Sequence, residues 1–410
     1  MRLHALPVDS PTLVDDIERC LSGSASWCPV PAGATARGDA LRASMRFGED
    51  IEPDIALVMA TSGSTGTPKG ALLTAGNLVA SADATHRVLG GPKPWLTCLP
   101  VHTIAGMQTV VRTLVAGFEP VIMDVSHGFA AEEFIALTEP DTYTSLVPNQ
   151  LHTLLHSLAG VEALQQYAGV LVGGAAIPKD LKTRAERLGI RLITTYGASE
   201  TAGGCVYDGV PIPGAQIAFS GDDGVPHVYS SHPAPGAGAD QSIPEGARIW
   251  LGGPMVARGY RNDTDNLNPG PDGKPSRGEL STSAFPRPGW FATSDSGTIS
   301  AGKLTVLGRF DTLINSGGLK LHPELLEHQI LQVPGVDEVC VVGLPDPKFG
   351  QIIAAAYTGS ATPAHVIEGL ADLPRWQLPK ELRRLDTLPT LTSGKVDRMS
   401  VEAKLARRGG

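Results

Sequence analysis

Short apolar runs alternate with amphipathic stretches from about Pro53 to Ala218. The run IALVMAT at 55–61 has the length of a buried strand, and AGNLVASADATHRVL at 75–89 repeats its apolar positions with the period of a helix. The apolar run PWLTCLPV at 94–101 and a helical stretch around 107–115 continue the alternation. Strands that alternate with helices indicate an α/β sheet domain.

The pattern changes twice in the second half of the chain. Between Ser220 and Pro288 the composition shifts to Gly, Pro, Asp and Ser around one apolar run, ARIWLGG at 247–253, which predicts a β-rich region with long loops. After Gly308 a compact α+β domain is expected. Its predicted elements are a helix from Pro323, strands at 338–344 and 351–359, and a helix near 365–373.

Length and charge narrow the class of protein. The 410 residues exceed one ordinary domain, so two domains of unequal size are expected. The chain has 33 Lys and Arg against 42 Asp and Glu, and its net charge of −9 repels nucleic acid and anionic lipid. The polar N-terminal stretch lacks a signal peptide's apolar segment, and no apolar run reaches membrane-spanning length. We predict a cytoplasmic protein without nucleic-acid binding or membrane insertion.

The cysteines do not indicate a metal or redox site. They are odd in number, scattered, and without a CxxC pair, so reduced thiols that pack as small apolar residues are expected. They are Cys20, Cys28, Cys98, Cys205 and Cys340.

A glycine-rich loop, TSGSTGTPKG at 61–70, follows the apolar run at 55–61. Its glycines let backbone N–H groups approach an anion, its hydroxyls add donors, and Lys69 adds a positive charge. This composition is typical of a phosphate site, and the alternative is a flexible linker. It is not a Walker A loop, because Thr67 and Pro68 separate Gly66 from the lysine. A polar turn and a helix are expected to follow.

Five further segments accompany the loop in a fixed order. They are GGAAIP at 173–178, TTYGASET at 194–201, GWFATSD at 289–295, GRFD at 308–311 and PTLTSGKVDR at 389–398. Together they resemble the signature motifs of the adenylate-forming superfamily, which includes acyl-CoA synthetases, luciferases and peptide-synthetase adenylation domains. The resemblance implies an enzyme that activates a carboxylic acid as its acyl-adenylate and passes the acyl group to coenzyme A. Ser294 departs from the family's usual glycine.

The resemblance also implies an ATP and Mg²⁺ site. The loop holds the β- and γ-phosphates, the tyrosine of TTYGASET stacks on adenine, and a threonine of that motif reaches the α-phosphate. Glu200 and Thr65 are the implied ligands of Mg²⁺, a hard cation that prefers oxygen. The implied ATP-binding residues are Thr61, Ser62, Gly63, Ser64, Thr65, Gly66, Lys69, Gly174, Ala175, Ala176, Thr195, Tyr196, Gly197, Asp295 and Arg309.

Lys395 lies in the SGK segment, where the resemblance implies contact with both the attacking carboxylate and the α-phosphate. A mobile lysine between two anions lowers their repulsion most as the transition state forms. Outside this context, such a lysine is more often a solvated side chain. The catalytic residues implied by the resemblance are Lys395, Glu200 and His102.

The resemblance divides the fold into a large N-terminal α/β sheet domain with a β-rich subdomain, residues 1–310, and a small mobile α+β lid domain, residues 311–410. Asp311 is the implied hinge, and rotation about it would exchange adenylation for thioester formation. Ser316, Gly317 and Gly318 would line the tunnel for coenzyme A. Because the phosphate loop already starts at Thr61, part of the usual N-terminal sheet must be trimmed or replaced. Relatives are often homodimers, so a homodimer is one expectation.

The acid is indicated by the segments LPVHTIAG at 99–106, SLVPNQL at 145–151 and SETAGGCVYDG at 199–209. They resemble the short actinobacterial 2-succinylbenzoate CoA ligases of menaquinone biosynthesis. In the implied acyl pocket His102 closes over the substrate, and Gly203 and Gly204 make room for the ring. Arg112 is a candidate donor for the unreacted carboxylate, with a surface salt bridge as its alternative. For His102 the alternative is a satisfied core residue.

Three other functions stay open at this point. The chain is alternatively a CoA ligase for another aryl or medium-length acid, which substrate profiling separates. An adenylation domain that loads a carrier protein would not use free CoA. A degenerate nucleotide-binding regulator would not need Lys69, Glu200, Asp295 and Lys395 together.

Overall fold

The computed structural model describes residues 1–33, 36–61, 68–221, 224–229, 243, 247–261, 278–310, 312–390 and 396–406. By compactness the chain forms two units. Unit 1 comprises Met1–Ser242, Ile249–Thr293 and Ser300–Leu304, and unit 2 comprises Ile243–Arg248, Ser294–Ile299 and Thr305–Gly410. None of the helices in the described ranges is long and apolar enough to span a bilayer.

Unit 1 begins with a four-stranded sheet of order β1-β2-β3-β4, in which only the β3–β4 pair is antiparallel. The chain before the phosphate loop therefore supplies two parallel strands and two helices, although the sequence predicted none of these elements. The predicted strand at 55–61 and helix at 75–89 are both confirmed. The elements are β1 (Leu3–Pro7), α1 (Leu13–Leu21), β2 (Ser26–Val30), α2 (Ala36–Met45), β3 (Ile55–Thr61), β4 (Lys69–Thr74) and α3 (Ala75–Leu89).

One local prediction in this sheet is wrong. A polar turn and helix were expected after the phosphate loop, but Lys69 starts strand β4, which pairs with β3 in the register Thr61↔Lys69. The pairing wins because it buries Gly70, Ala71, Leu72 and Leu73 against the sheet. The helix follows only at Ala75, where Thr74 and Asn77 form a reciprocal capping box.

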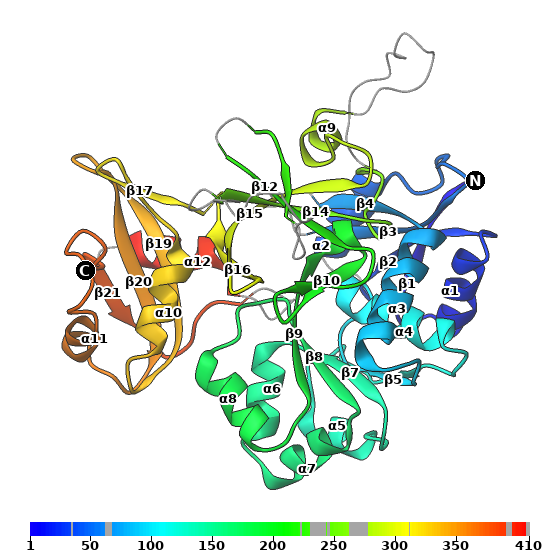
Figure 1. Ribbon diagram of the computed structural model, residues 1–410, viewed down its shortest axis with the longest axis horizontal. Helices are drawn as coiled ribbons and strands as arrows, with labels where there is room; N and C mark the ends of the chain where they lie inside the picture. The colour runs from blue at the N-terminus through cyan, green and yellow to red at the C-terminus, as the bar shows by residue number, and fades with distance from the viewer. Residues whose placement is uncertain are drawn as a thin grey trace, which may run out of the picture. The chain divides into compact units, whose positions relative to one another are not determined.

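The second sheet of unit 1 has the order β11-β10-β9-β8-β7-β5-β6 and is parallel from β6 to β9. Helices α5 to α8 cover one face over a core that includes Phe134, Leu151 and Leu164 (Figure 1). The strand and helix predicted over 94–115 are confirmed. The elements are β5 (Trp95–Thr97), α4 (Ile104–Val115), β6 (Val121–Ile122), α5 (Ala131–Ala136), β7 (Tyr143–Leu146), α6 (Pro148–Leu155), α7 (Leu158–Gln166), β8 (Gly169–Val172), α8 (Lys179–Arg187), β9 (Leu192–Ala198), η1 (Ser199–Thr201), β10 (Gly203–Tyr207) and β11 (Val210–Pro211).

A third sheet has the order β13-β12-β14-β15-β16, as expected for a β-rich region. The division between the two units falls within β14, β15 and β16. Its elements are β12 (Gln216–Ser220), β13 (His227–Tyr229), β14 (Ala247–Gly252), α9 (Glu279–Ala284), β15 (Trp290–Ser300) and β16 (Lys303–Arg309).

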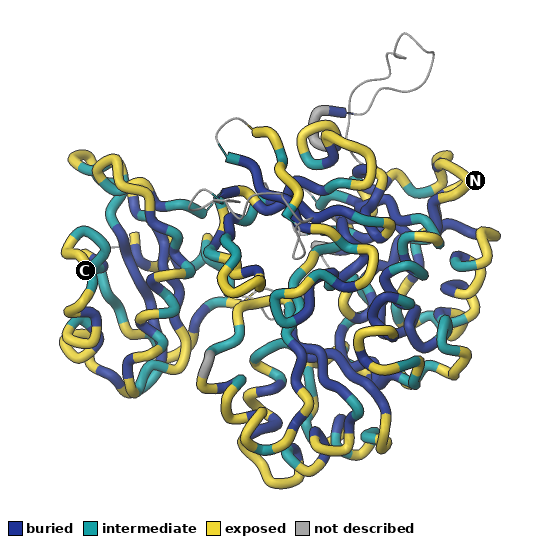
Figure 2. The backbone as a smooth tube through the Cα atoms, viewed as in Figure 1, coloured by how far each residue is buried: buried dark blue, intermediate teal, exposed yellow. Residues whose placement is uncertain are grey.

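The rest of unit 2 is a sheet of order β18-β17-β20-β19, with β21 also paired to β20. Alternate residues of β19 face opposite sides: Val341 packs with the core under α10, and Val342 with the core under α12. The middle parts of β19 and β20 are buried, at 339–342 and 353–358, whereas β17, β18, β21 and the outer faces of the helices are mainly half-buried or exposed (Figure 2). The elements are β17 (Ile314–Ser316), β18 (Leu319–Leu321), α10 (Pro323–Leu331), β19 (Val336–Asp346), β20 (Gly350–Gly359), α11 (Pro363–Gly369), β21 (Glu381–Arg384) and α12 (Arg398–Ala406).

Candidate active site

Glu200 sits at the tip of the β9–β10 hairpin, in the short η1 turn. The turn is tight because Ala202 and Gly203 both have positive φ, at 48° and 96°. The Thr201 hydroxyl accepts a hydrogen bond from the Ala198 N–H at 2.9 Å and donates to the Gly203 carbonyl at 2.8 Å. This arrangement fixes Glu200 in a position where only 7% of the residue is exposed.

Tyr260 links Glu200 to the end of the phosphate loop. Its hydroxyl donates to Glu200 Oε1 at 2.7 Å, and the Lys69 Nζ atom lies 5.3 Å from the centre of its ring. The segment around Tyr260 is held by backbone pairing, since the Arg261 N–H donates to the Gly70 carbonyl and the Ala257 N–H to the Glu200 carbonyl. The structure thus brings together a lysine and a carboxylate that lie far apart in the sequence.

The residues predicted to bind adenine and the α-phosphate lie just after β8 and within its parallel neighbour β9. Gly174, with φ of 80°, lies just after β8, and Thr195 is the central residue of β9, directly after the last residue that pairs with β8. A side chain at Gly173 would meet Thr195 Oγ1 at 2.2 Å, and one at Gly197 would meet the Gly203 carbonyl at 2.2 Å. The exposed segment Gly174, Ala175 and Ala176 and the half-buried Tyr196 therefore lie where α/β sheets bind ligands.

The predicted acyl-pocket residues gather around the start of α4. His102 is half-buried in the turn before this helix, whose N-cap Thr103 accepts the Gly106 N–H at 3.3 Å. A Cβ added at Gly203 would lie 3.4 Å from Gln108 Cγ, so this glycine packs directly on α4. Gln108 in turn donates to the Ala202 carbonyl at 2.8 Å. These contacts fix helix α4 against the β9–β10 hairpin.

Arg112 lies one helical turn beyond Gln108 and is only 3% exposed, so the surface salt bridge proposed as its alternative is wrong. Its Nη2 donates to the Tyr207 hydroxyl at 3.3 Å, and its guanidinium lies 4.9 Å from the Trp95 ring centre. Among the described residues its Nε has no hydrogen-bond partner, and no ion pair between them includes Arg112. Burial lowers the pKa of Arg112 because it disfavours the charged form.

Other buried polar atoms surround Arg112. His86 Nε2 and Gln108 Oε1 are buried and lack hydrogen-bond partners in the described parts of the chain. Burial, with Arg112 as the second cause, lowers the pKa of His86 from 6.5 to about 4. The region around Arg112 is therefore a buried cationic site whose charge is not balanced by a carboxylate of the described residues.

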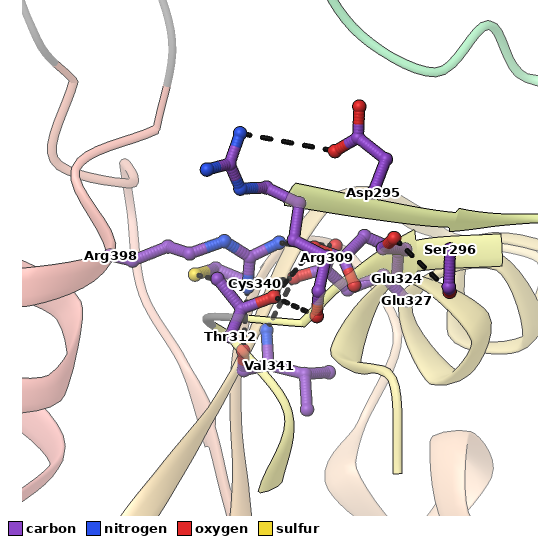
Figure 3. Close-up of polar contacts among 10 residues, drawn as sticks. Asp295, Ser296, Arg309, Thr312, Glu324, Glu327, Cys340, Val341 and Arg398 are labelled. Atoms are coloured by element: carbon purple, nitrogen blue, oxygen red, sulfur yellow. Dashed lines mark hydrogen bonds and ion pairs between the residues drawn. The ribbon is translucent and has the colours of Figure 1, made fainter. Parts of the chain in front are cut away.

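The predicted ribose-binding residues belong to unit 2. Asp295 lies in β15 and Arg309 at the end of β16, with 3.9 Å between Arg309 Nη1 and Asp295 Oδ1 (Figure 3). Ser294, which replaces the family's glycine, lies within the same strand, and its carbonyl accepts the Phe310 N–H at 2.8 Å. The strand does not require a glycine at this position, since Ser294 has no positive φ.

Gly317 and Gly318, predicted for the CoA tunnel, form the two-residue turn between β17 and β18. Their φ angles of 62° and 85° are those of a type I′ hairpin, which explains why both are glycines. The role of Ser316, Gly317 and Gly318 toward CoA stays a prediction. Several predicted residues lie outside the described ranges: Ser62, Gly63, Ser64, Thr65, Gly66, Asp311 and Lys395.

Two residues of this site were missed by sequence reasoning. Tyr260 lies in the segment MVARGYR, which matches none of the motifs, and Gln108 looks like an ordinary helical position. The prediction about cysteines is confirmed, because all five are buried and burial raises their pKa values to about 12.

Known proteins resemble the chain along most of its length. Residues 20–261 match the family described as AMP-binding enzyme, and residues 325–395 match the AMP-binding enzyme C-terminal domain. A probable 2-succinylbenzoate–CoA ligase from Mycobacterium tuberculosis is 37% identical over 99% of both chains. The 2-succinylbenzoate–CoA ligase of Escherichia coli is 30% identical over 85% of this chain and 68% of its own.

Solved structures show the same fold. ATP-bound MatB from Rhodopseudomonas palustris has a TM-score of 0.81 at 21% identity, covering 99% of this chain and 89% of that one. The o-succinylbenzoate CoA synthetase MenE from Bacillus subtilis, in complex with its acyl-adenylate intermediate, has a TM-score of 0.77 at 21% identity, covering 98% and 87%. With the motifs and the family matches, these likenesses identify the chain as a member of the AMP-binding enzyme family and an AMP-forming acid–CoA ligase.

Proposed function

We propose that this acid–CoA ligase converts 2-succinylbenzoate to its CoA thioester in menaquinone biosynthesis. The observation that carries the proposal is the 37% identity to the mycobacterial protein over 99% of both chains. That alignment includes the segments predicted to line the acyl pocket, around His102, Gly203 and Gly204. A likeness of the fold alone would not select an acid, because one fold supports many substrates.

Arg112 supports a substrate with two carboxylates. One carboxylate must react at the α-phosphate of ATP, and the other needs a cationic partner inside the protein. A buried guanidinium without a carboxylate in the described ranges is costly unless a ligand completes it. Arginine also matches a carboxylate geometrically, through paired N–H donors. We assign Arg112 to the unreacted carboxylate and His102 to closure over the reacting end.

The proposed reaction has two steps. In the first, a carboxylate oxygen attacks the α-phosphorus, the bond to the bridging oxygen breaks, and pyrophosphate leaves with its charge balanced by Lys69. Lys395 orients the carboxylate and lowers its repulsion from the α-phosphate. In the second step the CoA thiol attacks the acyl carbon and AMP leaves. Rotation about Asp311 would remove Lys395 from the site between the two steps.

The carboxylate of Glu200 fits a role in Mg²⁺ binding. It is a single buried carboxylate whose Oε1 is oriented by Tyr260, and Mg²⁺ is typically held by one or two protein carboxylates together with substrate phosphates and water. Mg²⁺ would supply charge neutralisation at the phosphates. Tyr260 keeps the carboxylate in one orientation before ATP binds, which reduces the ordering needed on binding.

The test is to incubate the purified protein with ATP, Mg²⁺, CoA and a panel of acids, following pyrophosphate release and acyl-CoA mass. The panel contains 2-succinylbenzoate, benzoate, a cinnamate-type acid and a medium-length fatty acid. Turnover of 2-succinylbenzoate well above the others, with free CoA and no carrier protein, is the expected result. Preference for a monocarboxylate would overturn the assignment of the acid. Pyrophosphate release without acyl-CoA would overturn the use of free CoA.

A further inference from the structure

The edge strand β19 is clasped by side chains from two helices on opposite faces of its sheet. Glu327 of α10 accepts the outward-facing Val341 N–H at 2.8 Å, and Arg398 of α12 donates to the Val341 carbonyl at 2.7 Å. The two side chains also bind each other, with Arg398 Nη2 donating to Glu327 Oε2 at 2.9 Å (Figure 3). They thus occupy the hydrogen-bonding groups that a neighbouring strand would otherwise pair.

We call this arrangement of Glu327 and Arg398 around Val341 the edge clasp. A second glutamate extends it toward the predicted hinge. Glu324 Oε1 lies 3.6 Å from Arg398 Nη2 and accepts the Thr312 hydroxyl at 3.2 Å. Thr312 directly follows Asp311 in the sequence. One guanidinium therefore contacts the edge of β19 and both glutamates of α10, and through Glu324 it is linked to the residue after the predicted hinge.

Arg398 lies three residues after Lys395, at the first position of α12. The residues before and after 391–395 are held together by two contacts. Thr390 and Val396 form a β-bridge, and the Asp397 N–H donates to the Pro389 carbonyl at 2.8 Å. Asp397 then caps α12 by accepting the Ser400 hydroxyl at 2.7 Å. Val396, Asp397 and Ser400, which follow Lys395 in the sequence, are thereby fixed by contacts within unit 2.

Arginine is suited to this junction and lysine is not. The clasp uses two nitrogens of one planar group, with Nη1 donating to the Val341 carbonyl and Nη2 to Glu327, whereas the three donors of a lysine ammonium all sit on one nitrogen. Burial alone would lower the pKa of Arg398, but Glu327 and the neighbouring groups raise it overall, so the cation is retained.

We propose that Arg398, through the edge clasp with Glu327 and Glu324, is a positioning residue that fixes Lys395 for the adenylation step. The inference rests on the proposed function of Lys395. Only two residues separate Lys395 from Arg398, so a fixed Arg398 would limit the positions that the lysine can reach. A shift of about 1 Å in such a group lowers the rate about 100-fold. The clasp lies wholly within unit 2, so it moves with the lysine and should not influence the second step.

The experiment compares Arg398→Lys with wild type in the two half-reactions, using the acid that wild type adenylates fastest. Pyrophosphate release in single turnover measures adenylation, and acyl-CoA formation from preformed acyl-adenylate measures thioester formation. We expect adenylation to fall about 10-fold to 100-fold with little change in KM for ATP, and thioester formation to change less than about 3-fold. In a Lys395→Ala background, Arg398→Lys should cause no further loss of adenylation.

Arg383→Ala is the matched control. Arg383 also tethers α12, through a 2.8 Å hydrogen bond to the Lys404 carbonyl at the far end of that helix. It should leave both half-reactions near wild type. Equal losses in both half-reactions for Arg398→Lys, or an additional loss in the Lys395→Ala background, would show a structural role and overturn the positioning role. If Arg398→Lys matches wild type while Lys395→Ala loses adenylation, the clasp alone is wrong. If Lys395→Ala keeps adenylation, the proposed role of the lysine is wrong and the clasp has nothing to position.

Discussion

Each unit contains a largely buried arginine, Arg112 in unit 1 and Arg398 in unit 2, and the two have different kinds of partner. In unit 1, Arg112 is 3% exposed and is met by an aromatic ring and a tyrosine hydroxyl. In unit 2, the Arg398 side chain is 31% exposed and is paired with two glutamates. The more deeply buried cation has the weaker protein partners, which is the reverse of what stability alone requires.

The difference fits the two roles proposed for the same residue type. Arg398 has two carboxylates within reach, as expected for a group that holds helices in place, although Glu324 Oε2 has no hydrogen-bond partner among the described residues. The charge of Arg112 is completed by no carboxylate of the described chain, as expected for a group that waits for an anion. Their different exposure does not show which role each arginine has. The identity of the partners does.

The largest expected effect comes from removing the cation that Glu324 and Glu327 share. Arg398→Met leaves Glu327 and Glu324 without their cation, and we expect the free energy of unfolding to fall by about 3 kcal/mol, the low end for a buried pair because the site is partly solvated. Urea denaturation measures the change. The double variant Arg398→Met with Glu327→Met removes both charges and should recover most of the loss. A single variant as stable as wild type would contradict the comparison.

Lowering the pH should destabilise the protein through His86, a neighbour of Arg112. The pKa of His86 is about 4 in the folded protein and about 6.5 in the unfolded chain, so between these values the unfolded chain binds a proton that the folded protein does not. Stability should therefore fall by on the order of 2 to 3 kcal/mol as the pH drops from 6.5 to 4. Urea midpoints across this range measure it. His86→Phe should remove that part of the pH dependence, and an unchanged profile in this variant would refute the assignment.

Removing the charge of Arg112 should weaken substrate binding without lowering the stability of the fold. Arg112→Leu is expected to raise KM for 2-succinylbenzoate about 30-fold, or about 2 kcal/mol, while the free energy of unfolding stays the same or increases. Steady-state kinetics and urea denaturation measure the two effects. A monocarboxylate substrate should show no such rise in KM. A loss of stability like that of Arg398→Met would mean that both arginines are structural.

The smallest expected effect concerns Glu200, a buried carboxylate in unit 1. Tyr260→Phe removes the 2.7 Å hydrogen bond to Glu200, and we expect about a tenfold loss of adenylation rate, or about 1.5 kcal/mol, with a higher Mg²⁺ requirement. Pyrophosphate release at varied Mg²⁺ measures both. Phe285→Leu, which alters a neighbour in ring contact with Tyr260, is a control that keeps the hydroxyl. Equal losses in both variants would point to packing and not to the hydrogen bond.

Much of the fold was predictable because its signals are local. The strand at 55–61, the helix at 75–89 and the paired strands of unit 2 are each encoded in the spacing of apolar residues over a few turns. The strand at 69–74 was missed because its apolar run is only three residues long and its pairing with β3 is set by the tertiary structure. Tyr260 was missed for a related reason, since it meets Glu200 across 60 residues of chain.

The sequence by itself determined the family and the chemical residues of its motifs, because phosphate loops and nucleotide slots need particular residue types in a short, fixed order. Only the tertiary structure decided which charges are balanced. Arg112 and Arg398 are indistinguishable as letters in a chain, and their partners come from residues up to 95 positions away. Balance of charge depends on distance in space and on exclusion of water, and neither is written in the local pattern.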